Sequence, residues 1–232
     1  MNFVASSPIL VPIQNTDETF PVNRLFFVGQ NYEDHAKEMG SETNKGSPFF
    51  FTKSPSAYVP SDSAIPYPPG TKNFHHEMEL VVAIGKPVFE AETEAAKQAI
   101  FGYACGLDMT RRDLQMEAKS KGLPWDMAKD VEQSAVLSEI VAVETIGHPE
   151  SGLIELSVNG EIRQSGDLRD LVNSPAELVA YLSSFYHLGP GDLIYTGTPS
   201  GVGPVLPGDH IEGYIQGVGT IELSISDQYR FT

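Results

Sequence analysis

The chain has 232 residues, 41% hydrophobic and 20% charged, which is enough to bury a sizeable core in one large domain or two small ones. Its 31 acidic and 15 basic residues give a formal net charge of -16 without a basic run, so we expect neither nucleic acid nor an anionic membrane surface as a partner. A single cysteine excludes an intramolecular disulfide framework, and no stretch reaches the roughly 20 apolar residues of a membrane span.

Residues 1–22 are expected to form an irregular lead-in with one apolar patch, from Ile9 to Ile13. This segment has neither the basic start nor the long apolar stretch that is typical of a signal peptide. The expected location of the protein is therefore the cytoplasm.

The next two elements are predicted to be a strand at residues 24–29 and a short helix within residues 31–40. The helix is expected to end at Gly40, because glycine readily adopts the left-handed conformation that closes helices. On this helix His35 and Glu38 are three residues apart, so they share a face and can touch.

Two acidic residues stand at the start of a predicted buried strand in the segment 75–85, whose second half is apolar, β-branched and closed by glycine. Side chains on a strand alternate, so Glu77 and Glu79 project to the same side, about 6.5 to 7 Å apart along the backbone. A second predicted strand at 101–107 ends at Asp108. Three carboxylates without a thiolate suit Mg2+ or Mn2+, although solvated acids and a helix cap fit the spacing equally well.

The remaining elements are expected to be a strand at 48–53, a proline-rich loop at 60–69, helices at 90–100 and 110–121, an irregular loop at 122–129, a hairpin at 153–164 and a helix from Ser174 through Leu188. The helix at 110–121 is expected to be capped by Asp108 or Thr110. Within the hairpin, Asn159 and Gly160 predict a two-residue turn. The glycine-rich segment 196–205 lacks the lysine of a phosphate-binding loop, so its amides and hydroxyls are expected to face a small carboxylate.

Several motifs occur together in the order that is typical of one enzyme superfamily. The motifs are Asn31-Tyr32-x-x-His35-x-x-Glu38, Phe51-x-Lys53, Glu77-x-Glu79-Leu80, Asp108-x-Thr110-x-Arg112-Asp113-x-Gln115, Gly122-x-Pro124-Trp125-x-x-Ala128-Lys129, Val158-Asn159-Gly160 and Thr196-Gly197-Thr198-Pro199-x-Gly201-Val202-Gly203. Each is weak alone, but in this order the chain resembles the fumarylacetoacetate hydrolase superfamily from about residue 24 to its last strand. It is most similar to the short members that act on fumarylpyruvate and other acylpyruvates.

The resemblance implies an α+β, β-rich fold, in which a mixed β-sandwich roll carries a few peripheral helices. Residues 23–232 are then expected to form a single catalytic domain that pairs as a homodimer. The resemblance also implies one Mg2+ or Mn2+ per site, held by Glu77, Glu79 and Asp108.

The other site residues also follow from the resemblance. His35 and Glu38 match a catalytic dyad on a lid helix, and Lys129 matches the lysine of the site. Gln115 and Thr198 match residues that contact the carboxylate and keto oxygens of a substrate. Arg112 fits a role in binding the substrate or in supporting the site, but its match is less specific. The neighbouring pair His75-His76 receives no ligand role. Taken singly, these residues also fit ordinary helix contacts, a surface ion pair and a turn.

The implied reaction is metal-dependent hydrolysis of the carbon-carbon bond of a 2,4-dioxo acid, most directly of 3-fumarylpyruvate to fumarate and pyruvate in gentisate breakdown. A metal held by three carboxylates acts as a Lewis acid, while His35 is suited to take a proton from water at neutral pH. Three alternatives stay open: hydrolysis of another acylpyruvate, decarboxylation or tautomerisation of oxaloacetate, and a non-catalytic carboxylate-binding protein with a structural Ca2+.

Overall fold

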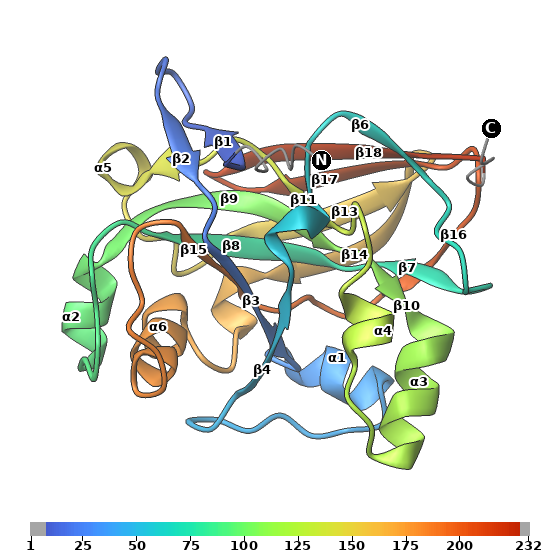
Figure 1. The fold of residues 1–232 in the computed structure, drawn as a ribbon, viewed down its shortest axis with the longest axis horizontal. Coiled ribbons are helices and arrows are strands. Elements are labelled where there is room, and N and C mark those ends of the chain that lie inside the picture. The colour runs from blue at the N-terminus through green and yellow to red at the C-terminus, as the bar shows by residue number, and fades with distance from the viewer. Residues whose placement is uncertain (1–7, 228–232) are drawn as a thin grey trace, which may run out of the picture.

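A mixed eight-stranded sheet forms the centre of the computed structural model, which describes residues 8–227 (Figure 1). Across the sheet the strands are β4 (Phe49–Lys53), β3 (Arg24–Gly29), β15 (Asp192–Tyr195), β8 (Met78–Ile84), β9 (Ile100–Asp108), β11 (Ala135–Leu137) and β5 (Tyr58–Pro60), with β12 (Val141–Ala142) beside β9. Every residue of β8 is buried, which explains its nearly continuous apolar sequence. β8 and β9 pair antiparallel with Met78 opposite Leu107, so the start of β8 lies beside the end of β9.

A second sheet packs against the central one and closes the core. Its five strands are β14 (Glu161–Asp167), β13 (Leu153–Val158), β17 (His210–Ile215), β18 (Gly219–Ser226) and β6 (Ser63–Pro66). Buried side chains of both sheets, such as Leu80 and Cys105 from the centre and Leu156 and Ile211 from the second sheet, form one hydrophobic cluster. The two layers together therefore hold the ends of β8 and β9 on a rigid support.

Smaller strand groups and short helices surround these sheets. The smaller groups are β10 (Thr110–Arg111), β7 (Phe74–His76) and β16 (Gly203–Val205), and the pair β1 (Leu10–Pro12) and β2 (Thr19–Pro21). The helices are α1 (Glu33–Glu38), α2 (Thr93–Gln98), α3 (Arg112–Lys121), α4 (Asp126–Lys129), α5 (Val143–Ile146) and α6 (Pro175–Ser183), with 3-10 turns at η1 (Pro55–Ala57) and η2 (Leu168–Asp170). Figure 1 shows α1, α3 and α4 gathered at one end of the molecule and α2 and α6 at the other. None of the described helices is long and apolar enough to cross a membrane.

This architecture confirms the expected β-rich α+β fold with peripheral helices. The predicted strands at 24–29, 48–53 and 101–107 are present as β3, β4 and β9. The hairpin has its turn at Asn159 and Gly160. Both residues have positive φ, as a two-residue turn of type I′ requires.

Several local predictions are wrong, each for a physical reason. The lead-in is not irregular throughout, because β1 and β2 pair with each other. This pair buries Val11 and Phe20 in a second hydrophobic cluster. Residues 1–7 lie outside the described part of the chain. The proline-rich segment contains β6, which is parallel to β18 at the edge of its sheet, where a terminal Pro66 is tolerated. The predicted division of the chain at residue 22 stays a prediction.

Helix boundaries were also predicted imperfectly. Instead of spanning 110–121, α3 starts at Arg112 without a side-chain cap, because Thr110 and Arg111 pair with β7. The segment 122–129, expected to be irregular, ends in the single turn of α4, and α2 and α6 are shorter than predicted. Tertiary contacts determine where these helices begin and end, and the helix propensity of the local sequence alone does not predict such contacts.

Candidate functional site

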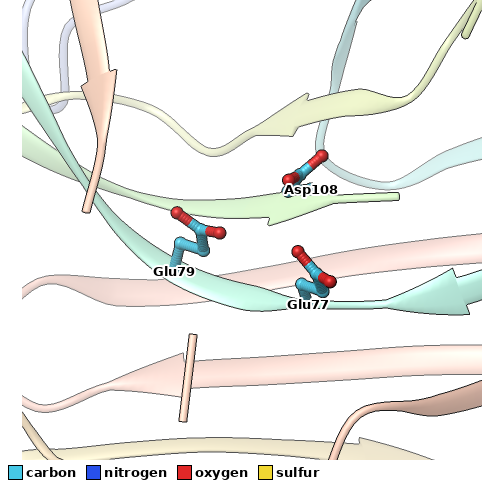
Figure 2. Close-up of side chains that lie close together, drawn as sticks. All are labelled: Glu77, Glu79 and Asp108. Atoms are coloured by element: carbon cyan, nitrogen blue, oxygen red, sulfur yellow. The ribbon is translucent and has the colours of Figure 1, made fainter. Parts of the chain in front are cut away.

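Three carboxylates converge where β8 starts and β9 ends (Figure 2). Glu77, Glu79 and Asp108 each offer one oxygen atom, and these atoms all lie within 4.8 Å of one another. The side chains are buried, with exposed fractions of 4%, 2% and 0%. A backbone hydrogen bond of 2.9 Å from Asp108 N–H to the Glu77 carbonyl holds the two strand ends together. The solvated-acid interpretation is therefore excluded.

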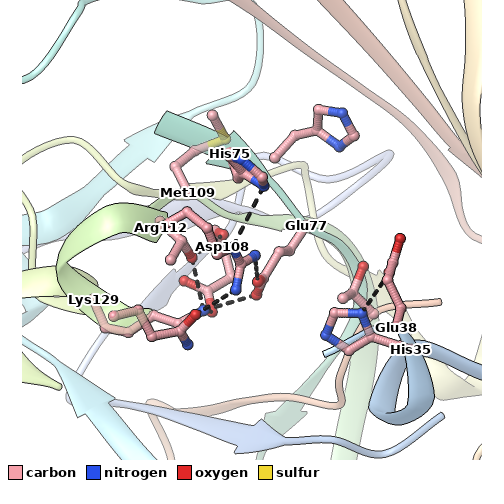
Figure 3. A network of polar contacts seen from close by, with 12 residues as sticks. His35, Glu38, His75, Glu77, Asp108, Met109, Arg112 and Lys129 are labelled. Atoms are coloured by element: carbon pink, nitrogen blue, oxygen red, sulfur yellow. Dashed lines mark hydrogen bonds and ion pairs between the residues drawn. The ribbon is translucent and has the colours of Figure 1, made fainter. Parts of the chain in front are cut away.

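Two buried cations neutralise part of this cluster (Figure 3). The Lys129 ammonium donates to Glu77 at 2.8 Å, to Asp108 at 2.6 Å and to the Thr110 hydroxyl at 2.7 Å, and Arg112 donates to the other oxygen of Glu77. Burial disfavours the charged form of Glu77, but Lys129 and Arg112 outweigh burial and hold its pKa well below the ordinary value. Lys129 is thus a residue of the site and not part of a surface ion pair.

Lys53, at the end of β4, is another buried cation, and its role did not follow from the sequence motifs. Its ammonium donates to the Met109 carbonyl at 3.0 Å, to the Ser134 carbonyl at 3.0 Å and to the Ser134 hydroxyl at 2.8 Å. It also lies 2.6 Å from Asp108 Oδ1, although its three N–H groups already have partners. Asp108 Oδ1 therefore stays buried without a hydrogen-bond donor.

Two features of the cluster fit a hard divalent cation: its ligands are carboxylate oxygens, and Asp108 Oδ1 has no hydrogen-bond partner among residues 8–227, only its ion pair with Lys53. Glu79 accepts a hydrogen bond of 2.7 Å from Gly197 N–H, and within residues 8–227 no basic side chain forms an ion pair with it. Burial and the neighbouring Asp108 and Glu77 raise the pKa of Glu79 well above the ordinary value. A cation between the three carboxylates would remove their repulsion, and Mg2+ and Mn2+ prefer such oxygen donors.

The helix α1 carries the predicted dyad at the side of the cluster (Figure 3). His35 Nδ1 lies 3.2 Å from Glu38 Oε2, and Gly201 N–H donates to both oxygens of Glu38 at 3.2 Å. The hydrogen bond from His35 and the one from Gly201 lower the pKa of Glu38, so this carboxylate is ionised and accepts the Nδ1 proton. His35 Nε2 is then left with a lone pair that can take a proton.

Arg112 holds Gln115 and is itself held by His75. Its guanidinium donates to the Gln115 side-chain carbonyl, and its Nε lies 3.4 Å from His75 Nδ1. His75 Nε2 lies 2.8 Å from the Asn73 side-chain oxygen, so Nε2 carries the proton and Nδ1 can accept from Arg112. The Gln115 carbonyl is occupied by Arg112, and within residues 8–227 its amide N–H groups have no hydrogen-bond partner, so they can bind an anion.

Thr198 is positioned by Gln164, a residue of β14 that the sequence did not single out. The Gln164 amide donates to Thr198 Oγ1 at 2.7 Å, while its carbonyl oxygen accepts from Met78 N–H at 3.0 Å. His76 Nδ1 lies 3.0 Å from the same oxygen and so carries the proton. Since Thr198 Oγ1 already accepts a hydrogen bond, its own proton is available to donate elsewhere.

The glycine-rich loop differs in one respect from the prediction. Its amides do face carboxylates, but these belong to the protein: Gly197 binds Glu79 and Gly201 binds Glu38. The loop therefore links the carboxylate cluster to the dyad.

One inner cavity collects most of the predicted side chains. It is lined by His35, Glu77, Glu79, Arg112, Gln115, Lys129 and Thr198. Asp108 and Glu38 do not line it, but they contact Lys129 and His35, which do. Trp125 also lines it, with its ring edge on Phe49 at a centroid distance of 5.4 Å, which gives the rare tryptophan a packing role. The catalytic and binding roles of these residues remain predictions, but their positions are compatible with a shared reaction centre.

The chain resembles known proteins over nearly its full length. Residues 24–226 match the family described as fumarylacetoacetate (FAA) hydrolase C-terminal. A fumarylpyruvate hydrolase from Ralstonia sp. is 52% identical over 177 residues, which cover 76% of this chain and 92% of that protein. The mitochondrial oxaloacetate tautomerase FAHD1 from Homo sapiens is 42% identical over 198 residues, covering 85% and 89%.

A solved structure shows the same fold. The crystal structure of fumarylpyruvate hydrolase from Pseudomonas aeruginosa in complex with Mn2+ and pyruvate superimposes with a TM-score of 0.94 at 43% identity. The match covers 97% of this chain and 99% of that one. The chain therefore belongs to the fumarylacetoacetate hydrolase family.

Proposed function

We propose that this protein is a metal-dependent hydrolase that cleaves 3-fumarylpyruvate into fumarate and pyruvate. The observation that carries the proposal is the convergence of Glu77, Glu79 and Asp108 beside His35 and Lys129 in a chain 52% identical to a fumarylpyruvate hydrolase. The structural relative with Mn2+ and pyruvate supports the same chemistry.

In this proposal Glu77, Glu79 and Asp108 hold one Mg2+ or Mn2+. The bound ion acts as a Lewis acid that makes the pyruvyl end of the substrate a better leaving group. Asp108 Oδ1 is buried and has no hydrogen-bond partner in the described part of the chain beyond its ion pair with Lys53, which supports a direct ligand role.

The dyad prepares the water for attack. His35 Nε2 removes a proton from a water molecule, and the water oxygen attacks the 4-keto carbon of the substrate. Glu38 accepts the Nδ1 proton and stabilises the resulting imidazolium, as a carboxylate does for the histidine of hydrolytic triads. His35 is only 6% exposed, so its burial keeps bulk water away from these groups.

The remaining residues bind and stabilise the substrate. Lys129 places positive charge where the tetrahedral oxyanion develops. The free N–H groups of Gln115 and the hydroxyl of Thr198 bind the carboxylate and keto oxygens of the pyruvyl end, while Arg112 orients Gln115. Cleavage of the bond between C3 and C4 releases fumarate and the enolate of pyruvate, which takes up a proton at C3.

A second candidate is tautomerisation of oxaloacetate, favoured by relatives of 42% identity that carry this name. The same groups can stabilise an enolate without water attack, and decarboxylation of oxaloacetate needs that stabilisation too. Hydrolysis of shorter acylpyruvates differs only in the group beyond the 4-keto carbon.

The proposal is tested by steady-state rates on fumarylpyruvate, acetylpyruvate and oxaloacetate. Each rate is measured with Mn2+ and again after a chelator has removed the metal. We expect fumarylpyruvate to have the highest kcat/KM, and its loss of diketo-enol absorbance to stop without metal. His35→Ala should lower kcat by roughly 10²- to 10⁴-fold without changing Mn2+ affinity, because a general base is lost and no ligand is. Turnover that persists without metal contradicts the metal role, and faster oxaloacetate turnover favours the second candidate. A non-catalytic binding protein predicts no turnover at all.

The proposal also includes a homodimer, a cytoplasmic location and one catalytic domain over residues 23–232. The family resemblance supports the dimer and the single domain. Analytical ultracentrifugation tests the dimer, and cell fractionation tests the location.

A further inference from the structure

A larger outer cavity continues outward from the inner cavity. The inner cavity has a volume of about 30 Å³, enough for an ion or one or two waters, whereas the outer one has about 620 Å³. Met39, Arg112 and Lys119 line both, so the two spaces are neighbours. A substrate whose reacting end lies at the carboxylate cluster therefore has room for the rest of its chain in the outer cavity.

The outer cavity combines apolar walls with one available cation. Met39, Met116 and Val202 supply apolar surface. Two basic side chains line it, and Arg112 already donates to Glu77, Gln115 and His75. Among the described residues 8–227 that line it, this leaves Lys119, an exposed residue of α3, as the cation available to an anionic ligand. The Glu38 carboxylate also lines the cavity, where it accepts hydrogen bonds from His35 and Gly201.

The position of Lys119 is fixed by the C-terminal end of α1. Its ammonium donates to the Met39 carbonyl at 2.9 Å and to the Ser41 hydroxyl. These two bonds hold the charge at the boundary of the two cavities and leave the third N–H group for a ligand. In a chain with a net charge of -16, such a local cation decides whether a second negative charge is tolerated.

We propose that Lys119 determines specificity by binding the second carboxylate of a dicarboxylic 2,4-dioxo acid, whose hydrocarbon link lies against Met39, Met116 and Val202. This inference rests on the proposed hydrolase function and deepens it, because it separates substrates that carry a distal carboxylate from simple acylpyruvates. A charge-assisted hydrogen bond of this kind changes affinity by roughly 10- to 100-fold.

The test measures a selectivity ratio, kcat/KM on fumarylpyruvate divided by kcat/KM on acetylpyruvate, with the full chain saturated with Mn2+. We expect Lys119→Met to lower this ratio roughly 10- to 100-fold, Lys119→Glu to lower it further, and Lys119→Arg to preserve most of it. Product inhibition gives a second readout: the inhibition constant of fumarate should rise in Lys119→Met while that of pyruvate stays the same.

Two matched controls separate charge recognition from other effects. Ser41→Ala removes one of the two bonds that position Lys119 but keeps the ammonium and its bond to the Met39 carbonyl, so the ratio should fall far less than in Lys119→Met. Lys121→Met removes a charge from the same helix at a residue whose ammonium pairs with Glu117 at 2.5 Å, and it should also leave the ratio unchanged.

The outcomes distinguish the two proposals. An unchanged ratio in Lys119→Met overturns the specificity role. If it comes with equal losses on both substrates, Lys119 only holds the end of α1 in place. If the unmodified protein turns over neither substrate with metal present, the hydrolase function itself fails.

Discussion

Buried cations form ion pairs with two of the three carboxylates of the cluster. Lys53 and Lys129 contact Asp108, and Lys129 and Arg112 contact Glu77. Removing one partner from such a buried network leaves an uncompensated charge, which costs about 3–5 kcal/mol in comparable proteins. Loss of activity after substitution of Lys53 or Lys129 must therefore be measured together with stability.

Gln164 offers a cleaner test of positioning, because it carries no charge and contacts Thr198 from outside the inner cavity. Its amide donates to Thr198 Oγ1 and its carbonyl is fixed by Met78 N–H and His76, so it sets the direction of the Thr198 hydroxyl. We expect Gln164→Leu to raise KM about tenfold, since one oriented hydrogen bond to a substrate carboxylate is weakened.

A double-mutant cycle decides whether Gln164 acts through Thr198. If it does, Gln164→Leu combined with Thr198→Val should be no worse in kcat/KM than Thr198→Val alone. Effects that multiply in the double variant indicate a general structural role, and thermal unfolding of all three variants measures that role directly.

At the scale of elements, the glycine-rich loop between β15 and β16 joins the two halves of the site. It reaches Glu79 through Gly197 and Glu38 through Gly201. At Gly201 φ is +96°, and a Cβ atom would lie 2.0 Å from the Arg163 carbonyl oxygen of β14. Only glycine allows the loop to lie this close to the second sheet.

Gly201→Ala tests this link, with Gly208→Ala as the matched control. Gly208 has φ of +95° and no atom within 4 Å of a Cβ, so both substitutions cost about 1–2 kcal/mol for the left-handed conformation. Only the change at Gly201 should also displace the loop, lower the melting temperature further and reduce kcat by releasing Glu38. Equal melting temperatures and equal kcat in the two variants contradict the role of the close contact.

Local patterns in the sequence predicted the elements that local chemistry determines. The turn at Asn159 and Gly160 and the helix start at Ser174 are both present, because each depends on neighbouring residues alone. At the helix start, Ser174 and Glu177 form a capping box. The alternation of strand side chains also placed Glu77 and Glu79 on one side. The resemblance supplied the pairing of these acids with Asp108, which spacing left open.

Long-range contacts were not predictable in the same way. Gln164 is 34 residues from Thr198 in the chain, and no motif marks it. Lys53 is part of the motif Phe51-x-Lys53, to which no role was assigned, and Lys119 was not singled out. Their contacts become visible only in the folded chain. The start of α3 at Arg112 likewise depends on pairing between β10 and β7.

For the whole molecule, two packed sheets provide a rigid platform, and α1, α3 and α4 lie together at one end of it (Figure 1). Side chains of these three helices line the inner cavity. The overall charge of -16 opposes an anionic substrate, so binding has to come from local cations and a metal. The central claim is therefore that one divalent ion lies among Glu77, Glu79 and Asp108.

A crystal structure with Mn2+ and pyruvate, with the ion located by its anomalous scattering, tests this claim most directly. We predict one strong peak per chain, in contact with all three carboxylates, and pyruvate within reach of Gln115 and Thr198. A peak at another position, or one that omits any of the three carboxylates, contradicts it.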